Sequence, residues 1–285
     1  MPKNLPPIGG HVSTAGGVQN AVANAKRIGA DAIQFFGASP QSWTAKRPAH
    51  EDVSAFRRAY TASGLKAAYL HAAYLVNLAS SDDIFYMKSV KSLTDHLSIA
   101  DALCINGLIF HLGSSKGMSR GEALDQEVLG MRKVLDAVPG PTELVMENSA
   151  GGGEKVGTTI EEIAYLFKKM NSPRVKVCLD TAHAFEAGMV TDYTPATVKE
   201  LFDDFDAAIG MKHLAAIHAN DSKTKAESHN DKHENIGQGF IGMKGFRALA
   251  ADARLHTVPW LLEVPGFEDE GPDEKNIKLL RGCFQ

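Results

Sequence analysis

Residues 175–183 read VKVCLDTAH, a short apolar run that ends in an aspartate, with a histidine three residues further on. Val175–Leu179 has the length and composition of a buried strand. Asp180 and His183 are about one helical turn apart, so both side chains can face the same pocket. A helix opened by the Thr194-Pro195 pair follows. This stretch therefore predicts a strand followed by a helix, with metal-binding residue types at the carboxyl end of the strand.

The same alternation of strand and helix recurs along the whole chain. The apolar runs that we interpret as eight buried parallel strands are Ile8–Val12, Ala32–Phe36, Ala67–Leu70, Leu108–Phe110, Leu144–Met146, Val175–Leu179, Leu214–Ile217 and Trp260–Leu262. Eight repeats of a strand and a helix favour a closed barrel over an open sheet, and such barrels take roughly 250 residues. We therefore predict an α/β fold, a single TIM (β/α)8 barrel that forms one domain over residues 1–285.

Apolar side chains at helical spacing mark the segments between the predicted strands. Such stripes run from Val18 to Ile28 and from Leu124 to Val138. Thr158 and Glu161 form a predicted capping box ahead of another helix. We interpret these stripes as the core-facing sides of helices that cover the barrel, and not as cofactor-binding segments.

The composition excludes several classes of protein. No apolar run is long enough to cross a bilayer, and the N-terminal sequence MPKNLPPIGGHVS lacks the features of a signal peptide. We therefore expect a cytoplasmic protein with no membrane partner. The 3 cysteines are far apart and form no CxxC pair, which argues against a disulfide framework and against a thiolate zinc site.

The formal net charge of −4 argues mildly against nucleic-acid binding, because proteins that bind DNA by bulk charge are usually basic. Bound divalent cations are missing from that formal charge and would change the local field. The charge alone therefore does not exclude a DNA substrate.

Six successive predicted strands end in a histidine, an aspartate or a glutamate. These residues are His71, His111, Glu147, Asp180, His218 and Glu263. In a barrel of parallel strands, all carboxyl ends point to one face, where active sites lie. Imidazole and carboxylate ligate divalent transition metals, and a mixed set points to a hydrolytic, water-activating centre. One such histidine alone is more often a hydrogen-bonded structural residue, and Asp180 alone is equally compatible with a helix N-cap.

The segment from Ala219 to Gly242, ANDSKTKAESHNDKHENIGQGFIG, is polar and has no helical or strand period. Loops of this length in a compact domain are usually functional or disordered. Asp231 and His233, two residues apart, can point to one side of an extended segment, which favours function. With His183 they bring the candidate ligands to nine, a number that suits three ions better than two. His11, which ends the first strand, is equally compatible with a supporting role beside the metal and with an ordinary structural role.

Several blocks of the sequence resemble the signature blocks of the endonuclease IV family, in the same order and over almost the whole chain. They are HVSTAGGVQNA near the start, HAAYLVNLA around His71, FHLGSS around His111, ENSAGGG at Glu147, LDTAHAFEAG at Asp180, HANDSK at His218, NDKHENIGQGFIG at Asp231 and LEVPG at Glu263. The resemblance implies a TIM barrel that holds three zinc ions, with manganese possible at some positions.

The resemblance also implies a ligand assignment and an activity. The implied sets are His71, His111 and Glu147 for the first ion, Glu147, Asp180, His218 and Glu263 for the second, and His183, Asp231 and His233 for the third. Among these, Glu147, Asp180 and Glu263 are the expected catalytic carboxylates. The implied activity is base excision repair of double-stranded DNA with abasic or 3′-blocked lesions: a metal-activated hydroxide cleaves 5′ to the abasic site and leaves a 3′-hydroxyl.

Three further positions are candidate DNA contacts by the same resemblance. Tyr74 stands where the family has a DNA-penetrating tyrosine, and an abasic nucleotide costs little to extrude because it has no base to unstack. Gln41 replaces an arginine that is common in the family, which puts one intercalating contact in doubt, while Trp43 remains. Leu112, Ala182 and Val264 also depart from the usual pattern, but none of them is a candidate ligand.

Two other functions fit parts of the sequence. A sugar isomerase or epimerase on a related barrel would use fewer metals and would not need His183 with the loop pair Asp231 and His233. A protein that binds damaged DNA without cleaving it would need a closed metal site, and nitrogen and oxygen ligands without thiolates argue against one. Nothing in the sequence indicates an oligomer interface, so a monomer is expected.

Overall fold

The barrel strands begin and end close to the predicted positions. The computed structural model describes residues 5–285 and shows the barrel strands as β1 (Ile8–His11), β2 (Ala32–Phe36), β3 (Ala67–His71), β4 (Gly107–His111), β5 (Glu143–Glu147), β6 (Val175–Asp180), β7 (Leu214–His218) and β10 (Trp260–Leu262). All pair in parallel, in the closed order β1-β10-β7-β6-β5-β4-β3-β2. The predicted TIM (β/α)8 barrel is thus confirmed for the described residues.

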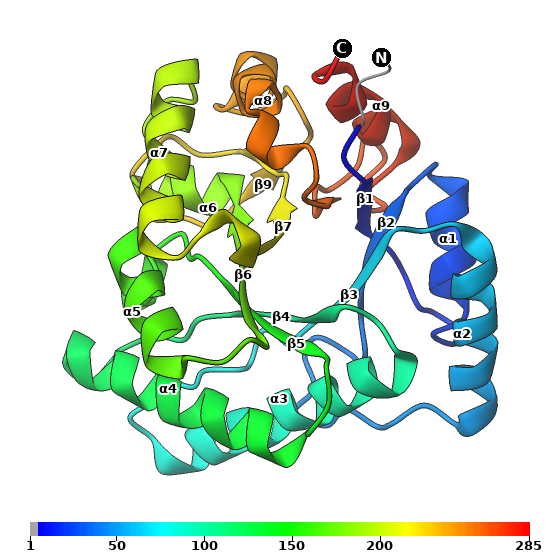
Figure 1. Cartoon of the computed structure of the whole chain (residues 1–285), viewed down its shortest axis with the longest axis vertical. Helices are drawn as coiled ribbons and strands as arrows, with labels where there is room; N and C mark the ends of the chain where they lie inside the picture. The colour runs from blue at the N-terminus through cyan, green and yellow to red at the C-terminus, as the bar shows by residue number, and fades with distance from the viewer. Residues whose placement is uncertain (1–4) are drawn as a thin grey trace.

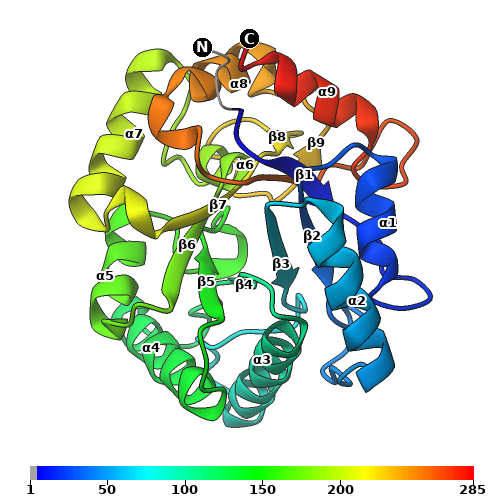
Figure 2. The ribbon, with the colours of Figure 1, turned by 45° about the vertical axis from the view of Figure 1, so that its right-hand side comes forward.

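The helices surround the strands as an outer ring (Figures 1 and 2). They are α1 (Asn20–Arg27), α2 (His50–Ser63), α3 (Asp83–Leu103), α4 (Arg120–Ala137), α5 (Ile160–Met170), α6 (Thr181–Glu186), α7 (Pro195–Ala208), α8 (Gly242–Ala251) and α9 (Glu274–Gly282). Their apolar sides and the outward sides of the strands form one continuous core. No helix in the described part of the chain combines the length and the apolar character that crossing a membrane requires.

Side-chain caps start several of these helices where the sequence offers a hydroxyl or a carboxylate. Thr194 caps α7 by accepting a hydrogen bond from the Thr197 N–H, as the Thr194-Pro195 pair predicts. The capping box predicted for α5 at Thr158 and Glu161 is wrong, and a single side-chain cap forms one residue later. Thr159 is the N-cap in place of Thr158, and its hydroxyl accepts a hydrogen bond from the Glu162 N–H.

A layer of mostly apolar side chains fills the inside of the barrel below the strand ends. Successive side chains of a strand point to opposite sides, so a residue and the one two positions later share the inside of the barrel. The members of the layer that stand two positions before a predicted metal ligand are Tyr69, Ile109, Val145, Cys178, Ala216 and Leu261. Each strand therefore places its last polar residue above this layer, facing the barrel axis.

The polar segment after β7 contains a short antiparallel pair, β8 (Asp221–Ser222) and β9 (His233–Glu234), which lies beside α6 (Figure 2). Each strand has only two residues, which explains why the sequence of this segment shows no strand period. The buried Asp221 carboxylate accepts hydrogen bonds from the N–H groups of Gly237, Gly239, Ile241 and Gly242. The segment has few apolar residues to bury, so the hydrogen bonds of this buried carboxylate hold it in place instead.

Candidate metal centre

Glu147, at the end of β5, is the common partner of the histidines at the barrel mouth. Its Oε2 atom lies 3.1 Å from Nε2 of His71 and 3.1 Å from Nε2 of His111. The ligand atoms of these three residues lie within 4.8 Å of one another. Strands β3, β4 and β5 are consecutive in the barrel, so their ends bring the three side chains together without any long loop.

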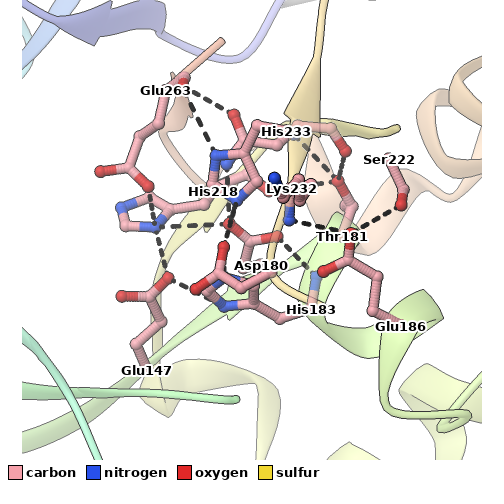
Figure 3. Close-up of polar contacts among 12 residues, drawn as sticks. Glu147, Asp180, Thr181, His183, Glu186, His218, Ser222, Lys232, His233 and Glu263 are labelled. Atoms are coloured by element: carbon pink, nitrogen blue, oxygen red, sulfur yellow. Dashed lines mark hydrogen bonds and ion pairs between the residues drawn. The ribbon is translucent and has the colours of Figure 1, made fainter. Parts of the chain in front are cut away.

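A second group forms on the other oxygen of Glu147 (Figure 3). Glu147 Oε1 lies 2.9 Å from Nδ1 of His218, which is also 3.2 Å from Glu263 Oε2. Asp180 Oδ2 lies 3.8 Å from the same nitrogen. The ligand atoms of Glu147, Asp180, His218 and Glu263 again lie within 4.8 Å of one another. Glu147 therefore belongs to both groups, with one oxygen directed to each.

The third group joins the end of β6 to the β8–β9 segment. The ligand atoms of Asp180, His183 and His233 lie within 4.8 Å of one another. Asp231 Oδ1 lies 3.2 Å from Nε2 of His183 and 3.6 Å from Nε2 of His233. All nine predicted ligands thus converge on one cluster, and Asp180 contacts two of its three groups.

Asp180 acts both as a helix cap and as part of the cluster, so the two readings of its sequence position are compatible. Its Oδ1 accepts a hydrogen bond from the His183 N–H at the start of α6, at 2.9 Å. Its Oδ2 accepts from Asn220 Nδ2 at 2.7 Å and faces His218 and His233. The cap fixes the carboxylate plane, and this orients the second oxygen toward the cluster.

Comparisons with known proteins point in the same direction as this geometry. Residues 22–283 match a family model described as xylose isomerase-like TIM barrel. "Probable endonuclease 4" of Campylobacter curvus is 37% identical over 278 residues, which cover 96% of each chain. The corresponding protein of Halorhodospira halophila is 37% identical, over 99% of this chain and 95% of its own. The crystal structure of endonuclease IV from Thermus thermophilus matches with a TM-score of 0.85 at 36% identity, over 98% of both chains.

The chain belongs to the endonuclease IV family. The resemblance in the sequence blocks is thereby confirmed. A D-tagatose 3-epimerase-like protein also matches, with a TM-score of 0.74, but at 15% identity it shares the fold alone. The similarity to sugar epimerases therefore shows only a shared barrel fold. The relatives above 30% identity show that the chain belongs to the endonuclease IV family.

Burial and neighbouring charges shift the pKa values of the ionisable groups in this endonuclease IV-family site in opposite directions. Burial alone would raise the pKa of Glu147, but the charges of His111 and His218 hold it well below its ordinary value. Burial likewise would lower the pKa of His183, but Asp180 and Asp231 raise it well above its usual range. Neighbouring histidines likewise lower the pKa of Asp231 and Glu263, so these three carboxylates are ionised and the cluster strongly favours positive charge.

The donor set fits divalent metal ions. Among the described residues, the Nε2 atoms of His183 and His233 are buried and make no hydrogen bond, although buried polar atoms are normally paired. Both atoms face the carboxylates of Asp180 and Asp231. Imidazole nitrogens and carboxylate oxygens are the ligands that zinc prefers in hydrolytic sites. Metal ions would satisfy these nitrogens and neutralise the carboxylates at the same time.

The cluster opens into a cavity of about 730 Å³, lined among others by Tyr74, His111, Lys155, Asp231 and His233. Tyr74 is 61% exposed, which argues against a packed structural role. Its ring lies 6.0 Å from that of His111 and therefore stands over the cluster.

Gln41 and Trp43 do not line this cavity. Gln41 is exposed, and the Trp43 ring lies 5.9 Å from the Phe85 ring. The structure therefore places Tyr74 at the candidate centre, whereas Gln41 and Trp43 lie outside the lining of its cavity.

Several residues that support the centre were missed in the sequence. Gln34 donates to Glu263 Oε1 at 2.5 Å, and its Oε1 lies 2.7 Å from His218 Nε2. The signal was present, because Gln34 is a polar residue inside an otherwise apolar strand, two positions after Ala32. The sequence left the role of His11 open. Its Nδ1 atom lies 3.7 Å from Glu263 Oε1 and 3.1 Å from Gln34 Nε2, so it supports the site indirectly.

Proposed function

We propose that this chain is a DNA-repair endonuclease that hydrolyses the phosphodiester 5′ to an abasic site and leaves a 3′-hydroxyl. One observation carries the proposal: in a chain of the endonuclease IV family, nine histidine, aspartate and glutamate side chains gather at one face of the barrel, beside a cavity. Once such a site holds divalent cations, it suits a phosphodiester better than a neutral sugar, because the bound cations attract the negative charge of the phosphate.

The proposed cofactor is three divalent ions, zinc or in part manganese. Their proposed ligands are His71, His111 and Glu147 for one ion, Glu147, Asp180, His218 and Glu263 for another, and His183, Asp231 and His233 for the third, with Asp180 beside it. When bound, the metals would supply Lewis-acid polarisation of the phosphate and activation of water at neutral pH.

The protein's own contribution is to orient these ligands before the substrate arrives. Gln34 holds Oε1 of Glu263 by a hydrogen bond, which leaves Oε2 for the centre. At Asp180, the His183 N–H holds Oδ1, and Asn220 orients Oδ2, the oxygen that faces the centre. His183 Nδ1 lies 2.9 Å from the Asn148 carbonyl, a contact that favours a proton on Nδ1 and a free Nε2. These contacts fix which atoms are available as ligands, and Glu147, Asp180 and Glu263 are the proposed catalytic carboxylates.

The proposed substrate is double-stranded DNA with an abasic or 3′-blocked lesion. Extrusion of a baseless sugar costs little stacking energy, so it would enter the cavity more readily than a normal nucleotide. We propose that the exposed Tyr74 ring fills the gap left in the duplex, with Gln41 and Trp43 contacting the strand beside it. The chain would act as a single barrel domain, as a monomer and in the cytoplasm, where it meets the nucleoid.

Cleavage of a labelled duplex that contains one abasic-site analogue tests the proposal. The expected result is a single cut 5′ to the lesion that is lost on chelation, with about three zinc ions per chain by metal analysis. Tyr74→Ala should reduce the preference for abasic over intact DNA by roughly tenfold, the equivalent of about 1.4 kcal/mol of stacking. Bound metal without any cut would contradict the proposal and favour the sugar isomerase class, for which ketose and aldose substrates would be screened.

A further inference from the structure

Lys155 is a lysine at the mouth of the cavity that neither the metal sets nor the predicted DNA contacts include. Its Nζ lies 3.6 Å from Asp231 Oδ2, while Oδ1 of the same carboxylate faces His183. The Asp231 carboxylate therefore lies between the Lys155 ammonium group and the candidate centre. Within the part of the chain that the structure describes, it is the single lysine or arginine among the side chains that line this cavity.

The backbone at Lys155 is held firmly, although the segment after β5 is irregular. Lys155 forms an antiparallel bridge with Ser114, and its carbonyl accepts a hydrogen bond from Arg120 Nη1 at 2.9 Å. The neighbouring Val156 N–H donates to the Gly113 carbonyl at 2.9 Å. These contacts tie the segment to the loop after His111, so the base of the side chain is fixed beside the centre.

The ammonium group, in contrast, is held weakly. The side chains of Lys155 and Asp231 are 30% and 36% exposed, and ion pairs of this kind contribute roughly 0–1 kcal/mol. A stronger partner can therefore displace Asp231 at little cost. A DNA phosphate is such a partner, and a lysine on a flexible four-carbon stem is well suited to meet it as a point charge.

We propose that Lys155 binds a backbone phosphate of the DNA strand at the rim of the cavity, next to the bond that is cleaved. This inference rests on the proposed function. The chain carries a formal net charge of −4, and Asp231 and Glu263 are themselves proposed metal ligands, so Lys155 is the basic side chain that this cavity offers to the approaching strand. Lys155 supplies that cation, and it does so as a substrate-binding residue and not as a metal ligand.

The salt dependence of DNA binding and cleavage tests this directly. Each neutralised phosphate contributes about −0.9 to the slope of log affinity against log salt concentration on duplex DNA. Lys155→Met should therefore make the slope shallower by about 0.9, and should raise KM roughly eightfold at about 0.1 M salt, with convergence near 1 M. The contact is made equally in the ground state and the transition state, so kcat should stay unchanged.

Two matched variants control the experiment. Lys155→Arg keeps the charge and should keep the slope of the unaltered chain. Lys199→Met removes an exposed lysine that pairs with Asp203 on the outer helix α7, and it should change neither the slope nor KM. Metal content, measured for each variant, should be equal to that of the unaltered chain.

The outcomes separate this inference from the proposed function. Slopes are measured both for cleavage of the abasic duplex and for equilibrium binding of an intact duplex. If the unaltered chain cuts no abasic DNA, the proposed function fails, and the binding slopes alone still decide the role of Lys155. Parallel slopes for Lys155→Met and the unaltered chain would overturn the inference. A fall in kcat at constant KM would also overturn it, because Lys155 would then act through Asp231.

Discussion

The two halves of the candidate centre are built in different ways. His71, His111 and Glu147 stand at the ends of neighbouring strands, where backbone pairing sets their spacing. Asp231 and His233 come from the irregular β8–β9 segment, which no barrel strand supports. We refer to these as the strand half and the loop half. Backbone pairing between strands is sufficient to position the ligands of the strand half. The ligands of the loop half need separate polar side chains to hold their backbone in place.

The anchors of the loop half are two buried carboxylates. Asp221 accepts hydrogen bonds from backbone N–H groups on the far side of the segment, between Gly237 and Gly242. Glu186, at the end of α6, accepts from Ser222 Oγ at 2.6 Å and from the Lys232 N–H at 3.3 Å. Lys232 lies between Asp231 and His233, so Glu186 holds the stretch of backbone that carries both candidate ligands (Figure 3).

The largest expected effect comes from Glu147, which the strand half shares with the second group. Glu147→Gln keeps the size of the side chain but removes the negative charge that both groups need. Cleavage of the abasic duplex should fall by roughly a thousandfold, or about 4 kcal/mol of barrier, while the far-ultraviolet circular dichroism stays unchanged. A rate equal to that of the unaltered chain would show that the proposed ligand assignment is wrong.

A smaller effect, confined to the loop half, is expected from Glu186→Ala. Loss of an anchor behind metal ligands typically weakens metal affinity about 10- to 100-fold. One equivalent of metal should therefore leave at lower chelator concentration than the others, which a chelator titration with metal analysis measures. Burial raises the pKa of Glu186, so Glu186→Gln, which keeps the size and an acceptor, should restore most of the affinity.

Glu200→Ala on the outer helix α7 is the matched control for this experiment and should leave the titration unchanged. If all equivalents of metal left together in Glu186→Ala, the distinction between the strand half and the loop half would fail.

The smallest effect on activity is expected at a buried glutamate of helix α4, which lies behind the strand half. Glu127 Oε1 accepts a hydrogen bond from the Gly113 N–H at 2.6 Å, behind the loop that follows His111. Burial raises the pKa of Glu127 from 4.5 to about 8. Between these two values the folded chain holds a proton that the unfolded chain has released, so this group makes stability fall as the pH rises from 4.5 to 8.

Glu127→Gln should remove that pH dependence. The variant should be more stable than the unaltered chain by on the order of 4 kcal/mol at pH 8 and about equally stable near pH 4.5. Denaturant unfolding at the two pH values measures the difference, and cleavage should change less than about twofold because a glutamine oxygen still accepts from Gly113. The same difference in stability at both pH values would contradict the assigned pKa.

The strand half could be predicted from the sequence because its signals are local. An apolar run followed by His71 or His111 specifies both the strand and the face on which the residue lies. The partnership of Gln34 could not be predicted, because it depends on Glu263, 229 residues further on. Thr158 and Thr159 are adjacent and equally suited to cap a helix, so the sequence alone did not distinguish them.

The loop half could be predicted only in part. The polar composition and the pair Asp231 and His233 indicated function, but the β8–β9 pairing has just two residues per strand and leaves no periodic signal. The role of Glu186 was hidden for a different reason. It occupies a helix end where a glutamate is usually solvent-exposed, and only the folded chain brings Ser222 and Lys232 against it.

The mostly apolar layer inside the barrel determines from which side reactants reach the centre. Side chains such as Ile109, Val145 and Leu261 close the barrel beneath the centre, and the Tyr69 hydroxyl is tied to the Ala215 carbonyl across it. Because the barrel is closed below, the cavity above the centre is the route that the described part of the chain offers to reactant and product. Under the proposed function, a duplex seated over this cavity would enclose the consumed water together with the substrate, and the cut strand would have to lift before the next molecule could enter.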